Sequence, residues 1–225
     1  GIGSLAEKSV HAVLKHYYAP SDDDMEVAVN GFVADVCYGM KIMEIQTRQF
    51  YTMKRKLEAF LPEYDVTIVY PVPVTKKLVY IDPETGKKIS SRRSNRKHSI
   101  YELFYEMYGI REFISSPGLH FTAVMYEAEE YRYSGRTEKH GRRIRTLTDT
   151  FPACVLDEVT IENTKDLMMF IPPELEDGFS TAQFAAAAGI HKELAAYCVG
   201  ILKNSGVIER TGTGKRGTYL YSVAE

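Results

Sequence analysis

The stretch FVADVCYGMKIMEIQT, residues 32–47, decides how this chain is interpreted. Two mostly apolar runs flank a turn at Gly39, and each run holds one carboxylate, Asp35 in the first and Glu44 in the second. An apolar strand rarely holds a lone charge, because taking a carboxylate out of water is costly unless a cation or a donor compensates it. Strand alternation places Glu44 and Gln46 on one side. We therefore expect Asp35 and Glu44 to face each other across a hairpin and to share a cation.

The residues around this stretch predict an α/β unit, a mixed sheet flanked by helices. Asn30-Gly31 is a strong two-residue hairpin turn, and Ser4-x-x-Glu7 fits a helix-capping box. A helix between two apolar strands predicts a parallel crossover. The predicted elements are a helix over 4–19, strands over 25–29, 32–38 and 41–47, a helix over 48–61, and two further strands over 65–72 and 77–82.

The middle of the chain is basic, with 13 Lys and Arg against 7 Asp and Glu over residues 85–145. Two stretches rich in Lys and Arg, 87–99 and 131–145, have few apolar residues and are predicted to be loops, the first of them mobile. Between and after them we expect a helix over 99–114, strands over 119–130 and 153–161, and a short helix over 163–170. Dense positive charge favours phosphate binding, so Arg92, Arg93, Arg142 and Arg143 are candidate nucleic-acid contacts.

Pro172-Pro173 mark a predicted boundary between two domains, 1–172 and 173–225. After it come two short helical patterns, 180–188 and 191–204, and a hairpin pattern with a glycine-rich tip. Helix, turn, helix and hairpin together predict a winged helix-turn-helix. Its candidate DNA contacts are Lys192, Lys215 and Arg216. Protein–protein contact or homodimerisation through this domain is the alternative, and the sequence leaves it open.

Composition limits the class of protein. Hydrophobic residues make up 44% and charged residues 26% of the 225 residues, which is typical of a globular chain. We see no apolar run of about 18 residues and no export signal, so we expect a cytoplasmic protein that does not enter a membrane. Cys37, Cys154 and Cys198 lie among apolar neighbours and are expected to be reduced and buried.

Asp-x8-Glu-x-Gln, following a Glu-bearing helix and followed by a basic helix, resembles the PD-(D/E)xK nuclease superfamily. The resemblance covers about residues 4–75 and implies a restriction endonuclease-like core. It implies that Asp35 and Glu44 hold Mg²⁺ or Mn²⁺ and that Glu7 occupies the position of a first-helix acid found in some members. It also implies that Gln46 takes the place usually held by Lys. The residues that would approach a phosphate backbone are Arg48, Lys54 and Arg55.

Two functions follow from these expectations. The first is a metal-dependent DNA endonuclease in which Asp35, Glu44 and Gln46 are catalytic and Gln46 orients the attacking water. The second is a nucleic-acid-binding or regulatory protein that keeps the nuclease-like scaffold without catalysis. An ion pair between Glu44 and Lys41 or Arg48 is the structural alternative to the metal role.

Overall fold

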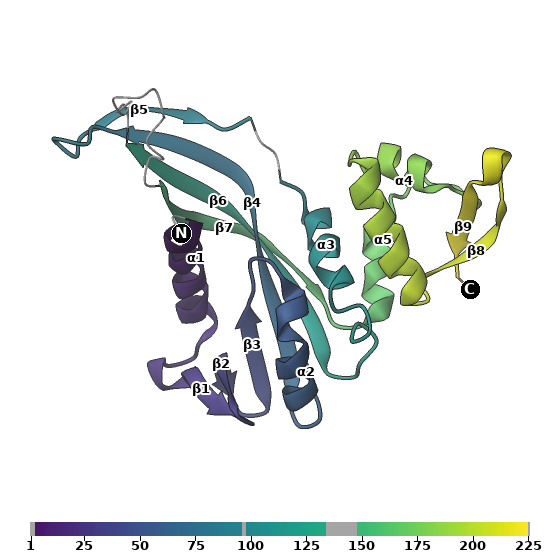
Figure 1. Ribbon diagram of the computed structural model, residues 1–225, viewed down its shortest axis with the longest axis horizontal. Coiled ribbons are helices and arrows are strands. Elements are labelled where there is room, and N and C mark those ends of the chain that lie inside the picture. The colour runs from purple at the N-terminus through teal and green to yellow at the C-terminus, as the bar shows by residue number, and fades with distance from the viewer. Residues whose placement is uncertain (1–2, 96–97, 134–147, 225) are drawn as a thin grey trace, which may run out of the picture.

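The structure is a computed structural model that describes residues 3–95, 98–133 and 148–224, apart from the side chains of residues 3–8, 148 and 149. A large sheet forms its centre, with helices on both sides and a small helical and hairpin part at the C-terminal end (Figure 1). Its α-helices are α1 (Gly3–Tyr18), α2 (Lys54–Phe60), α3 (Leu103–Tyr108), α4 (Thr181–Ala187) and α5 (Lys192–Asn204). Its strands are β1 (Met25–Val29), β2 (Phe32–Tyr38), β3 (Lys41–Ile45), β4 (Asp65–Ile81), β5 (Lys88–Arg93), β6 (Leu119–Tyr133), β7 (Thr148–Ile161), β8 (Ile208–Thr213) and β9 (Tyr219–Val223). Short 3₁₀ helices are η1 (Asp22–Asp24), η2 (Phe50–Met53), η3 (Ile100–Glu102), η4 (Thr164–Phe170) and η5 (Lys215–Gly217).

The central sheet is mixed and has seven strands, in the order β1-β2-β3-β4-β6-β7 with β5 on β4. The predicted meander is confirmed, because β1, β2 and β3 pair antiparallel in sequence order. Asn30 and Gly31 form its first turn with φ angles of 46° and 82°, the left-handed conformation that an Asn-Gly turn supplies. The predicted crossover is also confirmed, since β3 and β4 are parallel and α2 lies between them in the chain.

Strand β4 is longer than the sequence predicted. The two expected strands over 65–72 and 77–82 form one strand of 17 residues, so that prediction is wrong. Its first part pairs with β3 and its last part pairs with β5, while β6 runs along its other side. Pro71 and Pro73 have no N–H to donate, and they lie between the residues that pair with β3 and those that pair with β5. The strand therefore continues through both prolines.

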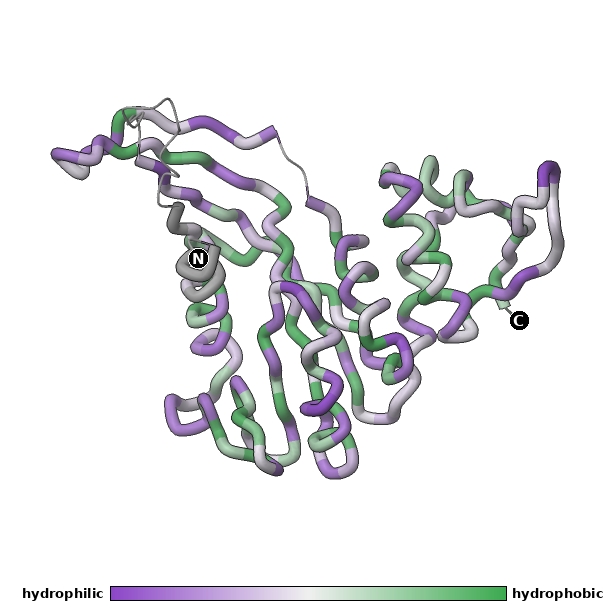
Figure 2. Tube along the Cα trace, viewed as in Figure 1, coloured by the Kyte–Doolittle hydropathy of each residue, from purple (hydrophilic) through white to green (hydrophobic). Residues whose placement is uncertain are grey.

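Part of the first basic stretch is a strand instead of the mobile loop that the sequence predicted. Residues 88–93 form β5, which pairs antiparallel with the end of β4. Asp82 fixes the preceding turn by accepting hydrogen bonds from the backbone N–H groups of Glu84 and Thr85. Every residue of β5 is exposed, and apart from the apolar Ile89 the turn and strand are mostly hydrophilic (Figure 2). Backbone pairing, which does not depend on apolar side chains, orders this segment; its Lys and Arg side chains suit the edge of a sheet.

Apolar residues cover both faces of the sheet. On one face, α1 packs Val10 and Leu14 against Val36, Ile45 and Val69. The opposite face carries the larger core, in which side chains of η2, α2 and α3 meet those of β3, β4 and β6. Its fully buried members from these elements include Ile42, Phe50, Leu57, Ile68, Phe104 and Phe121.

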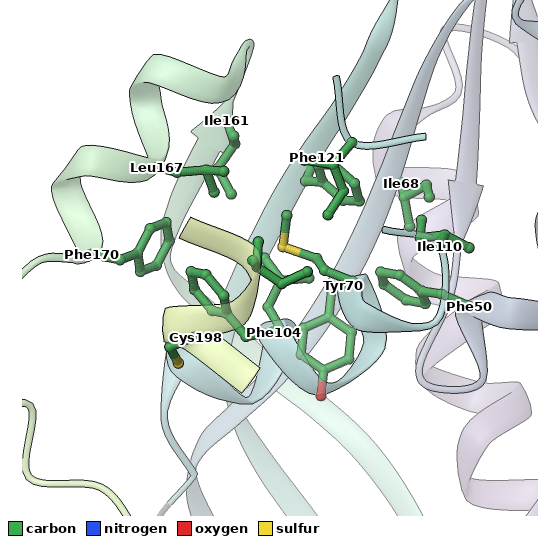
Figure 3. Packing of buried hydrophobic residues seen from close by; sticks show 14 of the residues in the cluster. Phe50, Ile68, Tyr70, Phe104, Ile110, Phe121, Ile161, Leu167, Phe170 and Cys198 are labelled. Atoms are coloured by element: carbon green, nitrogen blue, oxygen red, sulfur yellow. The ribbon is translucent and has the colours of Figure 1, made fainter. Parts of the chain in front are cut away.

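The C-terminal part joins this larger core. Phe104 of α3 packs edge-on against Phe170, and Cys198 of α5 lies in the same cluster (Figure 3). Tyr197 contacts the rings of Tyr105 and Tyr108, which fixes α5 against α3. The separation into domains 1–172 and 173–225 stays a prediction, and the shared core means that dividing the chain there exposes apolar surface on both sides.

Two of the predicted helices are shorter in the structure, and two of the predicted strands are longer. The helix over 48–61 is a 3₁₀ turn followed by the short α2, and the helix over 99–114 ends as α3 at Tyr108. Strands β6 and β7 extend further than expected because they pair with each other over almost their whole length.

Among the described strands β7 pairs with β6 alone, and its exposed residues include Cys154, Val155 and Leu156. Cys154 is therefore not buried as predicted, whereas Cys198 is.

The described helices include none that is long and apolar enough to cross a membrane.

Because Cys198 is fully buried in the shared core, its thiol should become reactive only when the whole protein unfolds. We expect its labelling by a thiol reagent, in a background with Cys37→Ala and Cys154→Ala, to follow the same urea transition as far-ultraviolet circular dichroism. Phe104→Ala should shift both curves together and cost about 3–5 kcal/mol of unfolding free energy. Labelling that precedes the loss of circular dichroism would show that the C-terminal part unfolds by itself.

Candidate functional site

Asp35 and Glu44 lie where the ladder between β2 and β3 opens. Regular pairing ends at Val36 and Met43, one residue before these two positions meet. Two side chain–backbone hydrogen bonds take over there. The N–H of Asp35 donates to Glu44 Oε1 at 3.3 Å, and the N–H of Ile45 donates to Asp35 Oδ2 at 2.9 Å. Each carboxylate therefore accepts a hydrogen bond from the backbone of the neighbouring strand, in the gap where the regular pairing of β2 and β3 stops.

Glu44 has no exposed surface. Lys56 of α2 donates to both of its carboxylate oxygens, at 3.0 Å and 2.8 Å. Burial and the negative charge of Asp35 raise the pKa of Glu44 to about 7, although Lys56 acts in the opposite direction. Glu44 is therefore paired within the protein by Lys56, a cation that the sequence alternative did not name.

Asp35 is held from the opposite side of the sheet. Its Oδ2 lies 3.0 Å from Nε2 of His11 on α1, and its side chain is 15% exposed. Burial acts to raise the pKa of Asp35, but the hydrogen bond and charge of His11 and the N–H of Ile45 outweigh it, so the pKa is lowered.

The two carboxylates do not face each other on one side of the sheet, so that expectation is wrong. Asp35 turns toward α1 and Glu44 toward α2, and these helices cover opposite faces. The reason is the break in the ladder: β1 and β2 lose regular pairing at Glu26, whose φ is 55°, which shifts the alternation at Asp35. We call His11, Asp35, Glu44 and Lys56 the carboxylate cluster; its ionic groups come from α1, β2, β3 and α2.

The other residues predicted for the nuclease site are Gln46, Glu7, Arg48, Lys54 and Arg55. Gln46 is half-buried just after β3, and its backbone N–H donates to the Val69 carbonyl at 2.9 Å. Glu7 lies in α1 one turn before His11, but its side chain is outside the described part. Arg48 precedes η2 instead of lying on a helix, Lys54 pairs with Glu112, and Arg55 is exposed.

The predicted nucleic-acid contacts on β5 and in the C-terminal part lie away from the cluster (Figure 1). Arg92 and Arg93 are exposed on β5, while Arg142 and Arg143 lie outside the described residues. Lys192 is exposed at the start of α5, and η5 at the tip of the β8–β9 hairpin exposes Lys215 and Arg216. The structure therefore leaves each described basic residue of this set open to solvent.

Sequence reasoning missed His11 and Lys56. A signal for Lys56 was present, because Met53, Leu57 and Phe60 at helical spacing place it beside the buried side of α2. No comparable signal marked His11.

The fold and the carboxylate cluster define a mixed α/β protein with two acidic side chains between its layers. Residues 8–162 match the family described as "Domain of unknown function (DUF8091)", and the chain belongs to this family. The match runs from α1 to the end of β7 and so contains the whole cluster. An "Uncharacterized protein" of Treponema pallidum (strain Nichols) is 25% identical over 225 residues, which cover 98% of this chain and 86% of that relative. No solved structure matches the chain.

Lys56→Met should destabilise the protein in a pH-dependent way, because it leaves the buried Glu44 carboxylate without its cation. With a pKa of about 7 against an ordinary 4.5, Glu44 holds its proton longer in the folded than in the unfolded chain, so stability falls as pH rises through this window. Removing Lys56 raises that pKa further. We expect a loss of about 3–5 kcal/mol in mildly alkaline buffer and a smaller loss in mildly acidic buffer, measured by urea unfolding.

Lys54→Met is the matched control on the same helix, since Lys54 is a partly exposed residue whose ion pair with Glu112 stabilises little. Adding Glu44→Gln to Lys56→Met should remove most of the pH dependence. A Lys56→Met variant that loses equal stability at all pH values would contradict an ionised Glu44.

Proposed function

We propose that this protein is a metal-dependent DNA endonuclease that hydrolyses phosphodiester bonds at the carboxylate cluster. One observation carries the proposal: Asp35 and Glu44 enter the same gap between β2 and β3, each within hydrogen-bonding reach of the other's strand. Two acids this close repel each other and cost folding free energy. Such an arrangement, with a strongly raised pKa at Glu44, is typical of functional sites.

The order of elements supports the proposal. The chain runs α1, β1, β2, β3, α2, β4, with an antiparallel meander followed by a parallel strand. This is the order that the resemblance to the PD-(D/E)xK superfamily implies. The carboxylate-bearing strands β2 and β3 occupy the second and third positions of the meander, as that resemblance requires.

The residues present fit a divalent cation with few protein ligands. In the described parts of the chain no group of three or more His, Cys, Asp or Glu is arranged to hold a metal ion. Mg²⁺ is commonly held by one or two carboxylates, with water and substrate phosphate completing its coordination. Because Asp35 turns toward α1 and Glu44 toward α2, a cation shared by both would require one carboxylate to leave its partner, His11 or Lys56, and to turn into the gap between β2 and β3. Such a cation supplies charge neutralisation at the phosphate and activation of water.

Lys56 supplies what Gln46 lacks. A neutral amide orients a water molecule by hydrogen bonding but offers no positive charge to a phosphate. The ammonium of Lys56 lies 2.8 Å from Glu44, so it brings a positive charge to the cluster from α2 instead of from β3. In the proposed reaction Gln46 positions the nucleophile and Lys56 stabilises negative charge.

The basic segments provide the second half of the proposal, a DNA-binding surface. We place the phosphate contacts on β5, through Arg92 and Arg93, and on the basic stretch that contains Arg142 and Arg143. Helices α4 and α5 with the β8–β9 hairpin would act as a winged helix, with Lys215 and Arg216 at the wing. Tyr197 ties α5 to α3, so the wing is the freer contact surface, and a homodimer through this part is the other role we consider.

A non-catalytic function is favoured by one observation. Glu44 is fully buried and both of its oxygens accept hydrogen bonds from Lys56, so a metal ion would have to displace that pair. On this second proposal the chain keeps a nuclease-like scaffold and acts as a nucleic-acid-binding or regulatory protein. Mn²⁺ binding and cleavage distinguish the two proposals.

Cleavage of duplex and branched DNA with Mg²⁺ or Mn²⁺ should depend on the cluster. Asp35→Asn and Glu44→Gln should abolish both Mn²⁺ binding by calorimetry and single-turnover cleavage. Gln46→Ala should keep Mn²⁺ binding and slow cleavage by about 10²-fold, the size of a lost positioning or acid–base group. Because Mn²⁺ needs the ionised Glu44, its affinity should rise as pH increases through about 7.

Charge relocation tests the role of Lys56. Lys56→Gln should slow cleavage, and adding Gln46→Lys should restore part of it by placing the cation on β3. If the wild type cleaves no form of DNA with either metal and Gln46→Lys creates no cleavage, the non-catalytic proposal replaces the first.

DNA affinity should depend on salt through the basic segments. Replacing Arg92, Arg93, Arg142 and Arg143 by Ala should weaken binding, and each lost phosphate contact should reduce the slope of log affinity against log salt by about one. Lys215→Ala with Arg216→Ala is the comparison at the wing. An unchanged slope in the first variant, with a reduced slope in the second, would show that the C-terminal part makes the phosphate contacts.

A further inference from the structure

A recess of about 500 Å³ lies on the face of the sheet that α1 covers, at the C-terminal end of this helix. Beneath α1 the floor of the sheet is apolar, with Val69 on β4 and Val124 on β6. Two residues earlier on the same strands and the same face, the floor changes to Thr67 and Thr122. The sheet therefore has no apolar core here and offers hydroxyl groups to whatever occupies the recess.

The charged side chains of the recess are mostly acidic. Three of its lining residues are carboxylates, Asp65, Glu158 and Glu162, and one, Lys41, is a cation of fixed charge. Glu158 is half-buried and accepts a hydrogen bond from the hydroxyl of Tyr18 at 2.9 Å, which fixes it at the end of α1. The recess thus repels anions such as phosphate and differs in charge from the surface proposed for DNA.

His120 lies beside two of these carboxylates. Its Nδ1 is 2.8 Å from the backbone carbonyl of Glu162, and because a carbonyl only accepts, Nδ1 donates in this bond. The same Nδ1 lies 3.2 Å from Oε2 of Glu162, and Nε2 lies 4.0 Å from Oδ1 of Asp65. The two exposed carboxylates therefore gather around the imidazole ring at the edge of the recess.

We propose that this recess binds a small organic cation with several N–H donors, an amine of the polyamine type. Acidic and hydroxyl groups recognise its ammonium groups, while the half-buried Met43 and Tyr38 contact its carbon chain. The volume exceeds what a single ion needs. The lining of the recess contains neither Asp35 nor Glu44, so this binding site is separate from the proposed nuclease site.

Putrescine is the probe, and the uncharged butanediol of the same chain length is its control. Calorimetry on the full chain should show saturable binding of putrescine and none of the diol. Asp65→Asn and Glu162→Gln should each weaken putrescine binding by about tenfold, as expected for the loss of one charge-assisted hydrogen bond. Both side chains are largely exposed, so these variants should fold normally.

Glu209→Gln on β8 changes the net charge equally and should leave binding unchanged. Thr67→Lys provides an internal ammonium group and should exclude the probe. Glu44→Gln should bind putrescine like the wild type. Absence of saturable binding, equal binding of the diol, or an equal loss in Glu209→Gln would overturn the proposal.

Discussion

Residues 68–72 of β4 are apolar on both faces, and this constraint organises the rest of the protein. A strand of this kind must be covered from both sides. Val69 meets α1, whereas Ile68 and Tyr70 meet the core beneath α2 and α3. The strands that flank this part of β4, β3 and β6, are consequently enclosed between helices on both faces, and polar side chains on β2 and β3 are buried with them.

The carboxylate cluster is the outcome of this enclosure. Each acid has its own compensating group from a different layer, His11 from α1 for Asp35 and Lys56 from α2 for Glu44. The charge state of the cluster therefore depends on both helices being in place. On the proposed function, a metal ion entering the gap would exchange these internal partners for external ones, so its binding would be coupled to the packing of the helices on the sheet.

The sequence predicted local features better than long-range ones. The Asn30-Gly31 turn, the helix over 180–188 and the meander are each determined by residues a few positions apart, and they were predicted correctly. The junction of two predicted strands into β4 and the pairing of β5 depend on partners far along the chain. The orientation of Asp35 was missed because it follows from a break in the ladder that no local pattern marks. The role of Lys56 could in principle have been predicted, because this residue lies beside the buried Leu57 on α2.

Strand β7 has a practical consequence for any measurement of oligomeric state. Its edge carries an exposed thiol, Cys154, beside the exposed apolar residues Val155 and Leu156. Apolar strand edges bring copies of a protein together at high concentration, and two such thiols then oxidise to a covalent link. A disulfide formed in this way during purification would be indistinguishable by size alone from a native homodimer. Samples kept reduced, or carrying Cys154→Ser, separate preparation chemistry from true assembly.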